Sequence, residues 1–213
     1  MKLISINIGK ARTQQNGEKL ETTGIYKMPV DGTVKIKSLG IVGDFIGSSK
    51  HHGGPDQAIY VYGAADYAWW SKELGKELAP GTFGDNLTIS ELQSADFNIG
   101  DRLHIGEVIL EVTAPRIPCS TLATRMGDSH FVKKYRHAER PGLYCRVIAE
   151  GEIKAGVGVT VQPVGGEAVS VVEIFRDWYE KSKDESTLRR FLRSPLAIRA
   201  RHDLERRLER LHF

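Results

Sequence analysis

The chain contains two cysteines, and their surroundings differ. Cys119 follows residues 115–118 (Pro-Arg-Ile-Pro), and we expect a helix to begin near Ser120. A helix N-terminus and the nearby Arg116 both favour a thiolate, the form that binds soft metals or attacks electrophiles. Cys145 alternates with apolar residues on an expected strand, which is typical of a buried, inert cysteine.

A polar loop at residues 47–57 is the second candidate for chemistry. It contains Lys50, His51 and His52, followed directly by Gly53 and Gly54. Adjacent glycines let backbone N–H groups approach a ligand, and the basic side chains add positive potential, which suits an anion such as phosphate. The order of a Walker A loop is absent. A solvated turn with incidental histidines is the alternative interpretation.

A third candidate, residues 80–88, has two glycines around Phe83 and then Asp85 and Asn86. The side-chain amide of Asn86 could bind a ligand that presents a donor and an acceptor. The alternative is a tight turn, with Gly84 at its bend, in which a side chain bonds the neighbouring backbone.

Other kinds of site lack their signatures in this sequence. The adjacent His51 and His52 do not have zinc-ligand spacing on a helix, and no C-x-x-C is present, although distant residues could still converge on a metal. The G-x-S-x-G of a hydrolase is missing. An iron–sulfur cluster would need four cysteines, and no segment resembles a flavin site.

The elements that must position these residues are mostly short strands. We expect a hairpin at 25–36 around Asp31-Gly32, and one helix at 64–78. Further strands are expected at 2–8, 57–62, 86–90, 101–105, 107–114, 143–149 and 157–162. Many short strands separated by glycine turns indicate a sandwich or barrel with few helices.

The C-terminal part differs in composition from the rest. All 22 glycines lie between Gly9 and Gly166, so we expect residues 1–166 and 167–213 to be two structural units, joined by a hinge at Gly165-Gly166. The net charge of +3 falls in the last 44 residues. These interspersed charges favour a solvated helical face, and the alternative is a docking surface for an acidic redox partner.

Three short helices are expected in the C-terminal part. Ser170 and Glu173 have the spacing of a capping box at the start of the first helix. A second helix is expected from about Asp184 to Leu192. Ser194-Pro195 has the pattern of an N-cap followed by a first-turn proline, which predicts the start of a third helix.

Composition limits the class of protein. The chain has 213 residues, enough for a sizeable core, and two cysteines exclude a disulfide framework, so we expect a cytoplasmic protein. The small net charge excludes a strongly basic nucleic-acid arm over the whole chain. The first residues alternate as in a strand, unlike a signal peptide, and no apolar run is long enough to span a membrane.

Taken in order, three segments resemble the MOSC domain family, and most nearly its YiiM-type bacterial subgroup with a C-terminal three-helix segment. The segments are 50–58, 81–87 and 115–119, and the resemblance extends over essentially the whole chain. Asp85 stands where the family more often has glutamate, a change that could alter one hydrogen bond.

The resemblance implies a mainly β, α+β fold: a MOSC-type β-barrel with a few peripheral helices, followed by the three-helix module. It also implies a molybdopterin-type molybdenum cofactor and a reaction that removes oxygen from N-hydroxylated compounds such as 6-hydroxylaminopurine, without pyridoxal phosphate. Electrons would come from a separate reductase, because no flavin or iron–sulfur site is expected here. No membrane and no stable nucleic-acid binding are implied, and an oligomer is compatible with the family.

The resemblance assigns roles to residues of this chain. Cys119 would ligate molybdenum, and Cys119, His51 and Lys50 would be catalytic. The cofactor-binding residues would be Lys50, His51, His52, Gly53, Gly54, Phe83, Gly84, Asn86, Arg116 and Cys119. Two alternatives stay open: a cofactor or sulfur carrier in which Cys119 bears a persulfide, and a binding module that acts through its basic helices without catalysis.

Overall fold

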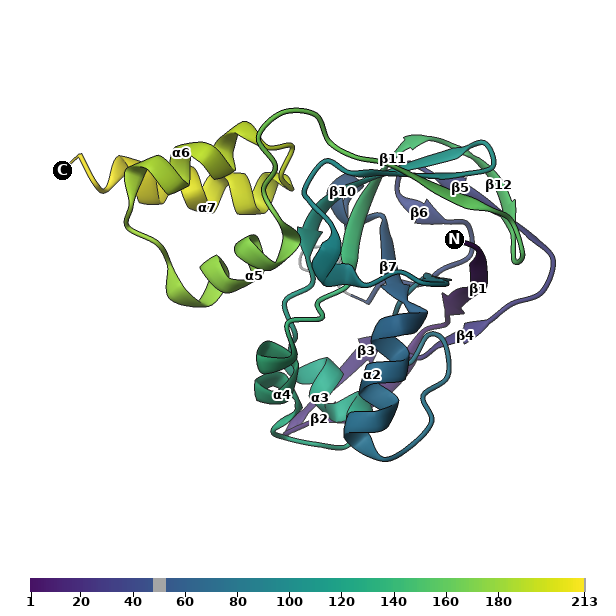
Figure 1. Cartoon of the computed structure of the whole chain (residues 1–213). Helices are drawn as coiled ribbons and strands as arrows, with labels where there is room; N and C mark the ends of the chain where they lie inside the picture. Colours follow the sequence, from purple (N-terminus) through teal and green to yellow (C-terminus); the bar gives the residue numbers. More distant parts are fainter. Residues whose placement is uncertain (48–52, 213) are drawn as a thin grey trace.

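The computed structural model describes residues 1–47 and 53–212 and is built around one large sheet (Figure 1). Its eight strands run in the order β13-β9-β10-β11-β7-β8-β1-β4. Neighbours are antiparallel except β7 and β8, which are parallel and joined through helix α2, as parallel pairing requires a crossover. The strands are β1 (Leu3–Gly9), β4 (Lys27–Pro29), β7 (Ile59–Gly63), β8 (Leu87–Ile89), β9 (Arg102–Ile105), β10 (Val108–Pro115), β11 (Leu143–Ala149) and β13 (Val159–Gln162).

The two ends of this sheet meet at the start of β1. Lys2 forms a single antiparallel bridge with Gly158, and the Val159 N–H donates to the Met1 carbonyl oxygen at 2.9 Å. The rest of that edge of β1 pairs with β4, which leaves no room for a longer ladder to β13. The mainly β, α+β fold is therefore confirmed, but the described strands form a curled sheet whose ends meet in one bridge, not a barrel closed by a continuous ladder.

Two small sheets complete the strand structure. One contains β12 (Gly151–Lys154), β5 (Thr33–Lys37) and β6 (Gly40–Ile41), and the other is the hairpin of β2 (Arg12–Asn16) and β3 (Lys19–Thr23). The expected hairpin at 25–36 is wrong, because β4 pairs with β1 and β5 pairs with β12. The chain bends at Gly32, whose φ is 84°, but this bend connects strands whose partners lie elsewhere in the chain.

Three helices lie together on one side of the sheet, as Figure 1 shows. They are α2 (Ala64–Leu74), α3 (Ser120–Met126) and α4 (Phe131–Ala138), and two short 3-10 turns, η1 (Pro55–Gln57) and η2 (Ser94–Asp96), lie in loops. Helix α2 ends before the expected residue 78, because Gly75 adopts the left-handed conformation that stops a helix, with φ of 63°. Helix α4 was not expected from the sequence.

The C-terminal part forms the three expected helices, α5 (Val171–Glu180), α6 (Glu185–Arg193) and α7 (Ile198–Glu209). The predicted capping box of α5 is confirmed, since the Glu173 N–H donates to Ser170 Oγ at 3.1 Å. The start of α7 at Ser194-Pro195 was wrong. Ser194 instead ends α6, where its hydroxyl donates to the Phe191 carbonyl oxygen at 2.7 Å, and α7 begins three residues beyond Pro195.

The C-terminal helices share one apolar core with the sheet. Their buried members in that core are Val171, Ile174, Leu188, Phe191 and Leu204. No helix among residues 1–47 and 53–212 is long and apolar enough to cross a membrane.

Three backbone segments are in direct contact near Gly24, since a Cβ atom added to Gly9 would lie 2.2 Å from the Gly24 carbonyl oxygen. A Cβ atom added to Gly24 would lie 1.8 Å from the Phe45 carbonyl oxygen, and one added to Gly47 would lie 2.3 Å from the Thr22 carbonyl oxygen. Only glycine permits such backbone contact. Gly24, Phe45, Gly47 and Thr22 therefore form a wall with no space for side chains at the crossing.

We expect Gly24→Ala to lower the free energy of unfolding by about 3 kcal/mol, since the methyl group would force fixed backbone apart. Chemical denaturation measures the change. Gly165→Ala is the matched control, because nothing lies within 4 Å of a Cβ at Gly165 and its φ is not in the left-handed region. Equal stabilities of the two variants would contradict the crossing.

Candidate functional site

A cavity of about 380 Å³ opens beside the glycine crossing, a volume in the range of small-molecule sites. It brings together four of the predicted residues, which are Gly84, Asn86, Arg116 and Cys119. Further lining residues that matter below are Gly24, Lys27, Asp44, Gln57, Tyr60 and Tyr144.

Arg116 is the buried cation of this cavity. Only 5% of its surface is exposed, its Nη1 donates to the Phe83 carbonyl oxygen, and its guanidinium lies 5.0 Å from the centre of the Tyr60 ring. Its Nε has no hydrogen-bond partner within the described part of the chain, and no carboxylate oxygen there lies within 4.0 Å of it. A buried charge of this kind needs a compensating partner, and an anionic ligand would supply one.

The surroundings keep Arg116 protonated. Burial lowers the pKa of its guanidinium, but the neighbouring Tyr144, Tyr60 and Cys119 outweigh burial and raise that pKa above its usual range. Arg116 and Cys119 line the same cavity, so the two predicted residues lie close together.

Lys27 and Asp44 form a second charged group in the cavity, which sequence reasoning missed. The Lys27 Nζ donates to both Asp44 carboxylate oxygens at 2.5 Å, and both side chains are buried. Burial lowers the pKa of Lys27, against the opposing effect of Asp44. Neither residue lies in a recognisable motif, so the sequence carried no local signal for this pair.

The side-chain amide of Asn86 is hydrogen-bonded to two other residues that line the cavity. Its Oδ1 accepts from the Tyr60 N–H at 3.1 Å, and its Nδ2 donates to Asp44 Oδ2 at 2.9 Å. Through these bonds it fixes strand β7 and the carboxylate that pairs with Lys27. The amide is thus already engaged on both sides, and its contribution to a ligand passes through Asp44 and Tyr60.

Asp85 is buried beside Asn86 and has partners for both carboxylate oxygens. It accepts from the Tyr67 hydroxyl at 2.6 Å, from Thr88 Oγ1 at 2.8 Å and from Asn7 Nδ2 at 3.3 Å. Burial raises the pKa of this carboxyl, and these hydrogen bonds act in the opposite direction. The shorter side chain is therefore fully accommodated at this position.

Cys119 is the N-cap residue of α3, as the sequence predicted, and its side chain is half-buried at the cavity. The hairpin of β2 and β3 covers this helix start, where Asn16 Nδ2 donates to Ser120 Oγ at 2.8 Å. Cys145 is completely buried in the core, which raises the pKa of its thiol. The expected division between one accessible and one core cysteine is confirmed.

Three further predicted residues, Phe83, Gly53 and Gly54, are described by the structure but do not line the cavity. The Phe83 ring is fully buried in an aromatic cluster with Tyr62, Tyr67 and Trp70, and only its carbonyl oxygen reaches Arg116. Gly53 and Gly54 lie just before η1, and Gly54 adopts a φ of 97°. Lys50, His51 and His52 lie outside the residues that the structure describes.

The buried phenols and the Cys145 thiol predict a loss of stability in alkali. Burial raises the pKa of Tyr60, Tyr62, Tyr135 and Tyr144, and that of Cys145. The unfolded chain releases these protons from about pH 8.5 for the thiol and about pH 10 for phenols, while the folded chain retains them. Stability present below those values is therefore lost as pH rises, at about 1.4 kcal/mol per pH unit for each ionised group.

Urea unfolding at pH 8, 9.5 and 11 measures this effect. The lowered pKa of Lys27 acts in the opposite sense, since stability rises with pH between its folded and unfolded values, but it is one group against several. Tyr135→Phe removes one of these phenols. Above pH 10 we therefore expect its free energy of unfolding to fall with pH less steeply than that of the wild type, by about 1.4 kcal/mol per pH unit. A free energy of unfolding that stays constant between pH 9.5 and 11 would contradict the prediction.

Comparison with known proteins agrees with the motifs. The family model for the MOSC domain matches residues 48–160. The uncharacterized protein YflK of Bacillus subtilis is 34% identical over 191 residues, covering 89% of this chain and 86% of YflK. Protein YiiM of Escherichia coli is 30% identical, covering 71% of this chain and 68% of YiiM.

Two further likenesses concern function and fold. A protein named "Reductase" from Gibberella moniliformis is 32% identical over 158 residues, which are 72% of this chain but 28% of the fungal protein. The crystal structure of YiiM from Geobacillus stearothermophilus superimposes with a TM-score of 0.80 at 27% identity, covering 97% of this chain and 98% of that one. The C-terminal helices are thus within the structural match.

Proposed function

Since this chain belongs to the MOSC domain family, we propose that it binds a molybdenum cofactor in the cavity between Arg116 and Cys119 and reduces N-hydroxylated compounds with it. The observation that carries the proposal is the buried Arg116 guanidinium, whose Nε has no partner among the described residues and which lines the same cavity as a half-buried thiol. A cation suits the phosphate of such a group, and a thiolate suits a metal that takes sulfur ligands. The residues present fit such a group.

Arg116 would hold the cofactor phosphate, and Cys119 would supply a thiolate ligand to molybdenum. The guanidinium is suited to this role because it donates several hydrogen bonds in a fixed plane and stays charged. Gly84 lets the chain pass close to Arg116, since a Cβ there would lie 3.3 Å from Arg116 Nη1. We also propose that Lys50, His51, His52, Gly53 and Gly54 contribute to cofactor binding from the neighbouring loop.

The proposed reaction converts R–NHOH to R–NH₂ and water, and it consumes two electrons and two protons. The cofactor, when bound, supplies the two-electron redox change. The chain must supply the protons. Lys27 lines the cavity with Asp44 holding its ammonium, and burial lowers the pKa of Lys27, so Nζ is a candidate proton donor. His51 and Lys50 are further candidate donors, as imidazole is the usual proton donor near neutral pH.

The electrons would come from a separate reductase. The chain corresponds to 28% of the fungal reductase, so most of that protein lies outside the match. The free cysteines of the described chain support a cytoplasmic location, where thiols stay reduced.

The test is turnover of a defined substrate. Protein loaded with molybdenum cofactor and mixed with a chemical reductant should convert 6-hydroxylaminopurine to adenine. Chromatography measures the adenine formed. Supplying a small-molecule reductant removes the need for the partner protein. Absence of adenine from fully loaded, folded protein would refute the reductase function.

A further inference from the structure

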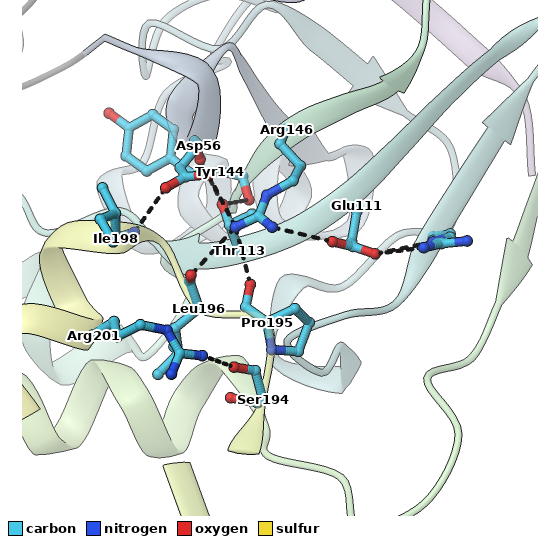
Figure 2. A network of polar contacts seen from close by, with 11 residues as sticks. Asp56, Glu111, Thr113, Tyr144, Arg146, Ser194, Pro195, Leu196, Ile198 and Arg201 are labelled. Carbon is cyan, nitrogen blue, oxygen red and sulfur yellow. Dashed lines mark hydrogen bonds and ion pairs between the residues drawn. The ribbon is translucent and has the colours of Figure 1, made fainter. Parts of the chain in front are cut away.

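The segment that connects α6 and α7 lies directly on the strands that lead into the cavity (Figure 2). The Ala197 N–H donates to the Thr113 carbonyl oxygen of β10 at 3.0 Å. Arg146 of β11 donates from Nη2 to the carbonyl oxygens of Pro195 at 3.3 Å and Leu196 at 3.2 Å. The connection is therefore fixed to the sheet just before Arg116.

Helix α7 is capped by a residue that lies 142 positions earlier in the sequence. Its N-cap residue, Ala197, has no side chain that can accept a hydrogen bond, and the Ile198 N–H donates instead to Asp56 Oδ2 at 2.7 Å. The second oxygen, Oδ1, pairs with Arg146 Nη2 at 2.9 Å. One carboxylate thus links η1, β11 and the start of α7, as Figure 2 shows.

Arg199, in the first turn of α7, reaches the same loop. Its Nη2 donates to the Gly53 carbonyl oxygen at 3.3 Å, and its Nη1 donates to Gln57 Oε1 at 3.4 Å. Gln57 lines the cavity. The C-terminal helices therefore contact both ends of residues 53–57, a described segment of the 47–57 loop that leads to β7.

We infer that the C-terminal helices brace residues 53–57, which include the adjacent Gly53 and Gly54, and that Asp56 and Arg199 are positioning residues for the ligand in the cavity. Adjacent glycines lose much conformational freedom when they are ordered. Contacts that order them before a ligand arrives raise its affinity, because that entropy is not lost on binding. The inference rests on the proposed function for the identity of the ligand, but the bracing itself is a property of the chain.

Arg199→Ala tests the inference with two readouts on the full-length protein. We expect hydrogen–deuterium exchange of residues 53–58 to rise about tenfold, and molybdenum and pterin retained after purification from cofactor-producing cells to fall about tenfold. Arg199→Lys keeps the charge with fewer donors, so its values should lie between those of the wild type and Arg199→Ala.

Arg207→Ala is the matched control within the same helix. Arg207 donates to Asp177 of α5 and to the carbonyl oxygen of Ser182 between α5 and α6, so neither partner belongs to residues 53–57. Arg207→Ala should lower the unfolding temperature without changing the hydrogen–deuterium exchange of residues 53–58 or the amount of cofactor retained. Equal losses of retention in Arg199→Ala and Arg207→Ala would show a general stability effect and overturn the inference.

Exchange and retention separate this inference from the proposed function. If the wild type retains no pterin, the proposed function fails, and the exchange of residues 53–58 alone decides whether α7 braces the loop. Unchanged exchange in Arg199→Ala overturns the brace in either case. Raised exchange with full retention would show that the loop is held by α7 but does not position the ligand, which also overturns the inference.

Discussion

Replacing Arg116 with methionine should reduce the retained molybdenum cofactor by about 100-fold, because an anion would lose its buried charged partner. The free energy of unfolding should change by no more than about 1 kcal/mol. Removing an uncompensated buried charge is favourable, and loss of the hydrogen bond to the Phe83 carbonyl oxygen opposes it. Molybdenum and pterin assays on purified protein, with denaturation curves beside them, measure both effects.

Arg125→Met is the control for this substitution. Arg125 is also partly buried, with its guanidinium 4.4 Å from the centre of the Tyr26 ring, but it does not line the cavity. Burial lowers the pKa of its guanidinium. Its replacement should leave cofactor retention unchanged. If Arg116→Met retained as much cofactor as the wild type, Arg116 would not be the anion-binding residue.

Replacing Cys119 with serine should lower the turnover of 6-hydroxylaminopurine by at least about 1000-fold, since a hydroxyl is a poor ligand for a soft metal. The folded structure should persist, because Cys119 caps α3 through its backbone carbonyl oxygen, which accepts from the Leu122 N–H at 3.1 Å. The measurement is the steady-state rate with a chemical reductant.

Cys145→Ser provides the matched comparison. It places a hydroxyl in the core and should lower the free energy of unfolding by about 1–3 kcal/mol while turnover is kept. More than a tenth of wild-type turnover in Cys119→Ser would contradict a role for this thiol in the reaction. Sulfur transfer by a loaded wild type without any turnover would instead favour the carrier with a Cys119 persulfide.

The parts of the fold that depend on nearby residues could be predicted from the sequence. The capping box of Ser170 and Glu173 and the helix start behind Cys119 depend on spacings of a few residues. The partners of β4 and β5 could not be predicted, because Asp31-Gly32 favours a turn whether the two strands pair with each other or with β1 and β12. The start of α7 was misplaced for a similar reason, since its cap is Asp56, 142 residues away.

The candidate site divides in the same way. Arg116 and Cys119 are close in sequence, and a motif indicates both. Lys27 and Asp44 meet only because three backbone segments cross at Gly24 and Gly47, and no local pattern reports such a crossing. The hydrogen bond from Asn86 Nδ2 to Asp44 could not be predicted for the same reason. The amide that we expected to contact a ligand already donates to this carboxylate.

X-ray absorption at the molybdenum edge can determine whether the cavity holds molybdenum with Cys119 as a ligand. Protein purified from cofactor-producing cells should contain molybdenum, and Cys119→Ser should show one sulfur neighbour fewer than the wild type. Absence of molybdenum from the wild type, or the same number of sulfur neighbours in both proteins, would contradict the account.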